Sequence, residues 1–344
     1  MAQIFGERWQ VQEGLTESGQ SWTYLVIDIT EAVEGLHVLK RLRNPRRLER
    51  FAQEIGALQN LNHENIVSLV DFNLEEERPW FVQEYCPGGD LQNYVIGHKD
   101  LDPDRALGLF IQATSGLVHA HDKGKIHRDI KPANVFLRAE HGPAVLGDFG
   151  LCWTEDSGER LTLTEEAVGS FHYMAPELRD GRVDEPSWRG DIYSLGKVLY
   201  FMLSGGRSFD REIHREEGRN LVTLRGDYLM EHVNYILDKM ITFEPDERSP
   251  AKEVLDHALS ARKLIGGAFS PLSTDVLTRC SFCGVGVYKP IADSDGAFQS
   301  FFGFLPGAVS NAKRDWRMLA CDHCGNIKFF ALSQSKSKWW PGQV

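Results

Sequence analysis

The sequence predicts an α+β protein with two lobes, a β-rich first lobe and a mainly helical second lobe, followed by a small β-rich module. Residues 9–42 alternate apolar and polar positions, which is typical of half-buried strands. Helical patterns then dominate and end by Leu264. Two Cys-x-x-Cys pairs follow in the remaining chain. A length of 344 residues accommodates a two-lobed domain and a small appendage.

The composition excludes several classes of protein. Hydrophobic residues make up 42% and charged residues 25% of the chain, as in globular proteins. We expect a cytoplasmic protein with no membrane partner, because no apolar run could cross a bilayer and the N-terminus lacks a signal pattern. Residues 263–344 carry 9 basic and 5 acidic residues, whereas the rest has a net charge of −15. The acidic part argues against nonspecific nucleic-acid binding there.

In the first lobe, residues 9–42 predict three antiparallel strands with turns near 17–20 and 32–35. Residues 47–61 have the apolar rhythm of a helix, and residues 80–86 form a further strand. Pro87-Gly88-Gly89-Asp90 ends this strand and links the lobes. The next helix is expected over residues 104–123, between Asp102-Pro103 and Gly124.

Residues 126–136 read IHRDIKPANVF, and Asp148-Phe149-Gly150 follows downstream. The loop holds a carboxylate that can accept a proton (Asp129) and a cation (Lys131). The amide oxygen of Asn134 and the carboxylate of Asp148 are hard ligands that suit Mg²⁺ beside phosphate oxygens. A proton acceptor beside two such ligands is what phosphoryl transfer from ATP to a hydroxyl requires.

These motifs closely resemble the catalytic loop and metal-binding motif of eukaryotic-type (Hanks-type) serine/threonine protein kinases, as found in bacteria. The resemblance covers about residues 8–262 and implies the bilobal kinase fold, with ATP and Mg²⁺, replaceable by Mn²⁺, as cofactors. Lysine two residues after the aspartate is the serine/threonine form of the loop. The implied domains are an N-lobe (1–86), a C-lobe (87–262), a linker (263–278), a zinc ribbon (279–333) and a tail (334–344).

The resemblance assigns Asp129, Lys131, Lys40 and Glu54 to catalysis, with an ion pair between Lys40 and Glu54. Asn134 and Asp148 would hold Mg²⁺. The implied ATP-binding residues are Thr16, Ser18, Gly19, Ser21, Thr23, Val38, Lys40, Glu84, Cys86 and Phe136, of which Glu84 and Cys86 act through their backbone. Gln83 would lie at the mouth of the adenine pocket.

The phosphate-binding loop departs from the family pattern. Thr16, Ser18 and Ser21 occupy the three glycine positions, and glycine would let the backbone approach phosphate more closely. An alternative reading is therefore a pseudokinase scaffold that binds nucleotide or partners without turnover. Incorporation of radiolabelled phosphate that is equal in wild type and Asp129→Asn would favour this alternative.

The segment between Asp148 and Ala175-Pro176-Glu177 carries Thr162 and Thr164, which resemble the autophosphorylation site of bacterial members, with Arg128 as the phosphate-binding residue. In the other reading, these hydroxyls are ordinary loop polarity and Glu165-Glu166 supplies the charge. Two copies of the chain could form a dimer while one phosphorylates the other.

Later motifs favour a protein substrate over a small molecule. Asp191 would anchor the catalytic loop, Ser170 would brace it, and Glu177 and Arg248 would form a buried ion pair. His127 and Phe149 would stack with Leu58 and Leu69 in an apolar column. His63, His119 and His121 are assigned to structural or surface positions, and Cys86 to packing.

Cys280, Cys283, Cys321 and Cys324 form two pairs, each followed by glycine, which favours a closed tetrahedral Zn²⁺ site over a redox dithiol. The module resembles a zinc ribbon, in which zinc is structural. It could contact a protein or nucleic acid, and this interaction module is the second alternative function. The Trp339-Trp340 tail is either frayed or a docking peptide.

Overall fold

The computed structural model describes residues 3–17, 21–149, 172–180, 187–227, 229–266, 282, 288–290, 316–321 and 326–331. The chain divides into two compact units, Met1–Arg262 and Lys263–Val344. Within the described ranges, none of the helices combines the length and the apolar character that a membrane span requires.

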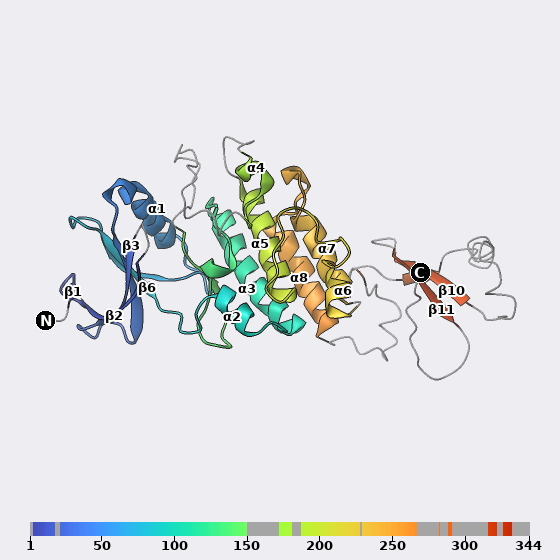
Figure 1. The fold of residues 1–344 in the computed structure, drawn as a ribbon, viewed down its shortest axis with the longest axis horizontal. Coiled ribbons are helices and arrows are strands. Elements are labelled where there is room, and N and C mark those ends of the chain that lie inside the picture. Colours follow the sequence, from blue (N-terminus) through green and yellow to red (C-terminus); the bar gives the residue numbers. More distant parts are fainter. Residues whose placement is uncertain are drawn as a thin grey trace. The chain divides into compact units, whose positions relative to one another are not determined.

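The first lobe is a six-stranded antiparallel sheet with one helix against it (Figure 1). Its strands are β1 (Ile4–Phe5), β2 (Trp9–Glu17), β3 (Ser21–Asp28), β4 (Leu36–Leu42), β5 (Leu69–Asn73) and β6 (Trp80–Glu84), in the order β1-β2-β3-β4-β6-β5. The three strands expected over residues 9–42 are β2, β3 and β4. Helix α1 (Leu48–Gln59) follows a short 3-10 turn, η1 (Pro45–Arg47), in which the Arg46 N–H donates to the Asn44 side chain.

The two faces of this sheet pack against different parts of the lobe. One face forms a core of Phe5, Trp9, Val26, Leu39, Trp80 and Val82. Because side chains alternate along a strand, Phe81 lies on the other face, where its ring is 5.2 Å from that of Phe51 on α1. Lys40 of β4 pairs with Phe81 in register, and Val38 pairs with Gln83. Val38, Lys40, Phe81 and Gln83 therefore share the face that α1 covers.

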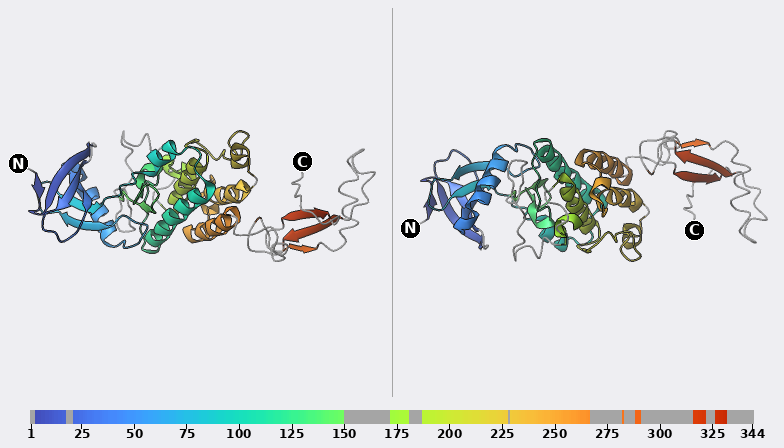
Figure 2. Two further views of the ribbon diagram at one scale, coloured as in Figure 1. Left: turned by 90° about the horizontal axis from the view of Figure 1, so that it is seen from below. Right: turned by 90° about the horizontal axis from the view of Figure 1, so that it is seen from above.

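The second lobe is mainly helical and includes a short two-stranded hairpin. Its elements are α2 (Leu91–Gly97), α3 (Pro103–Asp122), η2 (Pro132–Asn134), β7 (Val135–Leu137), β8 (Ala144–Leu146), α4 (Pro176–Arg179), α5 (Trp188–Leu203), α6 (Leu221–Arg225), α7 (Met230–Met240), η4 (Pro245–Glu247) and α8 (Ala251–Ile265). Figures 1 and 2 show α3, α5, α7 and α8 side by side. Helix α5 is buried from Gly190 to Leu203, so it forms the core of this lobe.

Local sequence signals explain where α3 begins and ends. The Asp102 side chain accepts a hydrogen bond from the Arg105 N–H at 3.0 Å, and Pro103 occupies the first turn. Gly124 follows the helix with a φ of +66°, a left-handed conformation that glycine adopts at little cost. The observed helix is shifted by one residue from the predicted 104–123.

The second unit contains a three-stranded antiparallel sheet in the order β11-β10-β9. Its strands are β9 (Tyr288–Pro290), β10 (Trp316–Cys321) and β11 (Ile327–Ala331). Cys321 is the last residue of β10 and pairs in register with Tyr288 at the start of β9. The side chain of Cys321, together with Cys280, Cys283 and Cys324, lies outside the described residues.

Candidate active site

The loop 126–131 is held in place by a buried carboxylate on α5. Asp191, 1% exposed, accepts hydrogen bonds at 2.8 Å from the backbone N–H groups of His127 and Arg128. His121 on α3 adds a contact of 2.9 Å between its Nε2 and Asp191 Oδ2. Burial opposes ionisation of Asp191, but His121 and the backbone donors outweigh it and hold its pKa below the usual value.

This anchoring explains a strained backbone. Arg128 has a φ of +70°, which is uncommon for a residue with a side chain. The two backbone hydrogen bonds to Asp191 oppose relaxation of this turn. As a result, Asp129 and Lys131 project from a loop whose path is fixed by the core helix.

Asp129, Lys131 and Asn134 form one polar cluster. Lys131 Nζ is 2.7 Å from Asp129 Oδ2. The Asn134 amide nitrogen donates to Asp129 Oδ2 at 2.9 Å and to the Asp129 carbonyl at 2.8 Å. Since the nitrogen of Asn134 is used in this way, its amide oxygen is the end of the side chain left for a metal ion.

Lys40 joins the two lobes electrostatically. Its Nζ lies 3.1 Å from Glu54 Oε1 on α1 and 3.4 Å from Asp148 Oδ1 in the second lobe. The ion pair expected between Lys40 and Glu54 is therefore present. Burial alone would lower the pKa of Lys40, but the carboxylates of Asp148 and Glu54 outweigh it and raise that pKa.

The two carboxylates differ in their titration. Lys40 holds the pKa of Asp148 below its usual value, so this group is ionised at neutral pH. Burial raises the pKa of Glu54. Asp148 is the more exposed of the two, with 42% of its side chain accessible against 8% for Glu54. Its charge is thus available to a metal ion, while Glu54 is positioned to orient Lys40.

An apolar surface lies at the other end of the site. Val67, Cys86 and Val145 form a buried cluster, and Phe136 packs against it. Burial raises the pKa of the Cys86 thiol to about 12, so the group is neutral and acts as a small apolar side chain. Gln83 is 6% exposed, and its buried side-chain oxygen has no hydrogen-bond partner among the described residues.

The structure places some predicted residues and leaves others undescribed. Ser21 and Thr23 lie on β3 and Val38 on β4, all half-buried, and Glu84 ends β6. Ser18, Gly19, Thr162, Thr164 and Ser170 lie outside the described residues, as does the side chain of Thr16. Within the described ranges, no three His, Cys, Asp or Glu side chains converge as a metal-ligand group.

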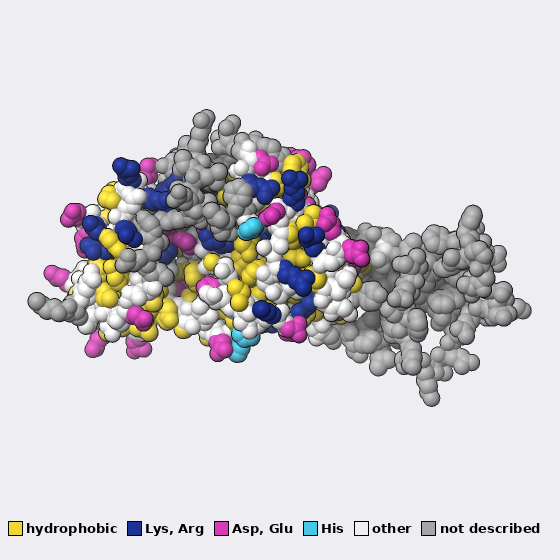
Figure 3. All heavy atoms as spheres, in the orientation of Figure 1, with side chains coloured by type: hydrophobic (Ala, Val, Ile, Leu, Met, Phe, Trp, Pro, Cys, Tyr) yellow, Lys and Arg dark blue, Asp and Glu magenta, His cyan; other side chains and the backbone are white. Residues whose placement is uncertain are grey.

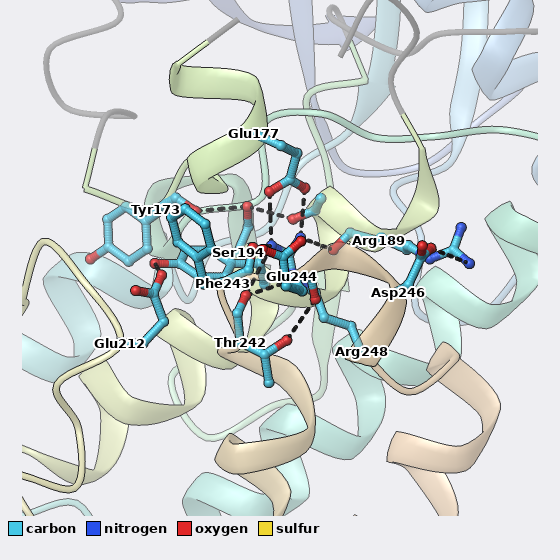
Figure 4. A network of polar contacts seen from close by, with 12 residues as sticks. Tyr173, Glu177, Arg189, Ser194, Glu212, Thr242, Phe243, Glu244, Asp246 and Arg248 are labelled. Carbon is cyan, nitrogen blue, oxygen red and sulfur yellow. Dashed lines mark hydrogen bonds and ion pairs between the residues drawn. The ribbon is translucent and has the colours of Figure 1, made fainter. Parts of the chain in front are cut away.

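A second buried ion pair stabilises the helical lobe. Arg248 donates to both carboxylate oxygens of Glu177, with distances of 2.6 and 2.8 Å. Figure 4 shows this pair at the centre of a polar network, in which Arg248 also donates to the carbonyls of Arg189 and Thr242. The two side chains are 0% and 5% exposed, as the sequence predicts for this pair.

Three features were missed by sequence reasoning, two of them at the site and one in the core of the helical lobe. His121 contacts Asp191 rather than serving only as a packing or surface residue. Arg138, which follows β7, forms a bidentate ion pair with Glu84 at the end of β6. Lys197 is buried inside α5. No motif marks these residues, and their partners are distant in the sequence.

The surface shows no strong bias of charge on the face drawn in Figure 3, where acidic and basic side chains are interspersed.

Comparison with known proteins identifies similar chains. A model described as the protein kinase domain matches residues 25–260. The serine/threonine-protein kinase PrkC of Bacillus subtilis (strain 168) is 34% identical over 211 residues, 60% of this chain and 32% of the relative. The maternal embryonic leucine zipper kinase of Danio rerio is 33% identical over 215 residues, 61% of this chain and 31% of the relative.

A probable serine/threonine-protein kinase of Clostridium perfringens is 31% identical over 208 residues, 60% of this chain and 30% of the relative. The chain thus matches about a third of the length of each of these curated relatives.

Proposed function

The chain belongs to the protein kinase domain family, and from this membership we propose that it transfers the γ-phosphoryl group of ATP to serine and threonine hydroxyls of proteins. One observation carries the proposal. Lys40, Glu54 and Asp148 form a connected ion-pair group, and Asp129, Lys131 and Asn134 form a second polar group on the anchored loop. This set can bind a triphosphate and a metal ion and accept a proton.

Each side chain has a role in the proposed transfer. Asp129 accepts the proton of the substrate hydroxyl. At the same time the hydroxyl oxygen bonds to the γ-phosphorus, and the bond between the γ-phosphorus and ADP breaks. Lys131 neutralises charge on the transferring group, and Lys40 binds the inner phosphates. Glu54 holds Lys40 in position through the 3.1 Å contact.

The side chains of Asn134 and Asp148 fit Mg²⁺, which prefers oxygen ligands and needs few from the protein. The ionised state of Asp148 and the orientation of Asn134 support this assignment. When bound, the ion would neutralise phosphate charge. The base would rest on Phe136 and the apolar cluster beside it, and the backbone of Glu84 and Cys86 would bind its edge.

The test of the proposal is incorporation of radiolabelled phosphate from ATP by the full chain. Asp129→Asn should reduce incorporation by about 100-fold or more, because the general base is lost while the polar geometry is preserved. Asp104→Asn, an exposed carboxylate on α3, is the matched control and should retain wild-type incorporation. Equal incorporation by wild type and Asp129→Asn would contradict the proposal.

We further propose that Thr162 or Thr164 carries a phosphate in the active protein. A phosphothreonine adds about −1.5 to −2 charges and can bind an arginine such as Arg128. Intact-mass analysis of a preparation with demonstrated activity should show at least one phosphate that Thr162→Ala with Thr164→Ala removes. An active preparation without phosphate would exclude this step.

The second unit is proposed to be a zinc ribbon that serves as a structural or interaction module. The backbone topology supports this. The antiparallel order brings the start of β9, the end of β10 and the start of β11 to one end of the sheet. Cys321 ends β10, and in the sequence Cys283 comes five residues before β9 and Cys324 three residues before β11. Four thiolates would form a closed tetrahedral site.

A further inference from the structure

An ion pair between Arg138 and Glu84, here called the clamp, connects β6, the last strand of the first lobe, to the β7–β8 hairpin of the second lobe. Arg138 donates from Nε to Glu84 Oε2 at 3.0 Å and from Nη2 to Glu84 Oε1 at 2.9 Å. Its Nη1 donates to the Glu64 carbonyl at 2.5 Å. The same Glu84 carboxylate accepts the Ser68 N–H at 3.0 Å. Arg138, which follows β7, thus connects this strand to β6 and to the segment between α1 and β5.

The backbone near this clamp is held equally closely. The Gly88 N–H donates to the Leu137 carbonyl at 3.0 Å, and the Leu137 N–H donates to the Gly89 carbonyl at 2.9 Å. A Cβ atom at position 88 would lie 2.3 Å from the Ala139 carbonyl oxygen, so only glycine permits this approach. Asp90 forms a bridge with Phe136. The segment between the lobes is therefore tied to β7 along several residues.

The clamp borders the proposed base site. Phe136 is the middle residue of β7 and packs on the cluster that includes Cys86. Arg138 lies two residues after Phe136, and Glu84 lies two residues before Cys86. The slot that would receive a planar base is lined by Phe136 of β7 under one face of the base and by the segment 84–86 along its edge, so the position of this segment relative to β7 fixes how the two surfaces meet.

We propose that Arg138 and Glu84 are positioning residues that preform this slot and so set the affinity of the protein for adenine nucleotides. The inference rests on the proposed function, because it takes the ATP site as given. Without the ion pair, the segment 84–86 would move away from β7 in a fraction of the chains. Apparent affinity would then fall with the fraction of chains in which the slot is formed.

The strength of the pair is adequate for this role. An exposed ion pair contributes little, but this one is bidentate and only 31% and 22% of the two side chains is exposed. Additional hydrogen bonds to the Glu64 carbonyl and from the Ser68 N–H fix both partners. Removal of one side leaves the other partly buried and unpaired.

The test is calorimetric binding of Mg·ADP to the full chain in wild type, Arg138→Met, Glu84→Gln and the double variant. We expect Arg138→Met to weaken ADP binding by about fivefold to tenfold and Glu84→Gln by about threefold. The double variant should be no weaker than Arg138→Met alone, because the two side chains act as one unit. Arg262→Met removes a bidentate pair with Asp104 on α8 and α3, and should leave ADP affinity unchanged.

A second probe separates the slot from the phosphate end. Adenosine lacks phosphates, so Arg138→Met should weaken adenosine and ADP by the same factor, whereas Lys40→Met should weaken ADP alone. Variants that have a lower melting temperature but bind ADP like wild type would overturn the inference and leave the proposed function intact. Wild-type protein that binds no ADP would overturn both.

Discussion

At the scale of single residues, Lys197 shows how burial lowers the pKa of a lysine side chain. The residue is 3% exposed in α5, and its Nζ donates to the Phe209 carbonyl. The Phe209 ring centroid lies 3.8 Å from Nζ, and that of Tyr193 lies 5.6 Å away. Burial lowers the pKa of Lys197 to about 7, although Asp210 and Glu212 oppose the shift. The protonated form is therefore costly in the folded protein.

This cost predicts a specific dependence of stability on pH. Between pH 7 and 10.5 the unfolded chain binds a proton at Lys197 that the folded chain does not, so the free energy of unfolding rises with pH across this range. Lys197→Met removes the cost and should stabilise the protein by about 2–3 kcal/mol at pH 6, with a smaller gain as pH approaches 10.5. Urea unfolding of the full chain at pH 6, 8 and 10 measures this difference.

The matched control for this prediction is Lys252→Met, which removes an exposed lysine from α8. It should leave the difference in stability between pH 6 and pH 10 unchanged. If Lys197→Met follows the wild-type curve in parallel at all three values, burial of this lysine is not the source of the pH dependence.

At the scale of elements, the Glu177–Arg248 pair connects α4 with the turn η4 before α8. Its charges are almost fully buried, so the loss of one partner leaves the other without solvent or counter-ion. Glu177→Gln should therefore destabilise the protein by about 3–5 kcal/mol. Asp104→Asn breaks an ion pair between α3 and α8 whose side chains are 41% and 43% exposed, and should cost less than about 1 kcal/mol.

Urea unfolding at neutral pH distinguishes these two variants. Equal shifts in the midpoint would mean that burial does not determine the contribution of the Glu177–Arg248 pair. A large shift for Glu177→Gln alone would show that the pair is required for the helical lobe, independently of any effect on catalysis.

The elements also show how far sequence alone can predict structure. The strands β2 to β4 and helix α3 follow from apolar spacing and from signals such as Asp102 and Gly124, which act within a few residues. The loop 126–136 is recognisable because its chemistry is concentrated in one stretch. In contrast, Arg138 and Glu84 are 54 residues apart. A spacing pattern predicts which face of an element a side chain lies on, but it does not predict which distant residue that side chain contacts. The burial of Lys197 is equally invisible, since lysine is normally exposed.

At the scale of the whole molecule, the chain consists of two units with different chemistry. The family model ends at residue 260, just before the boundary between Arg262 and Lys263. The second unit carries a net charge of +4, with 9 basic and 5 acidic residues in 263–344, and four of the 6 cysteines. It therefore adds to the kinase domain a module that the family model does not cover.

The final prediction concerns what stabilises this module. A small sheet of three strands buries little apolar area, and such modules commonly depend on a bound metal for folding. We expect about one zinc ion per full-length chain by elemental analysis, and Cys321→Ser should lower the zinc content because three thiolates leave the fourth position of the tetrahedral site open. Ser281→Ala, inside the first Cys-x-x-Cys pair, should retain zinc. If Cys321→Ser holds as much zinc as wild type, the four cysteines are not one site, and the stability of the second unit must come from its apolar residues alone.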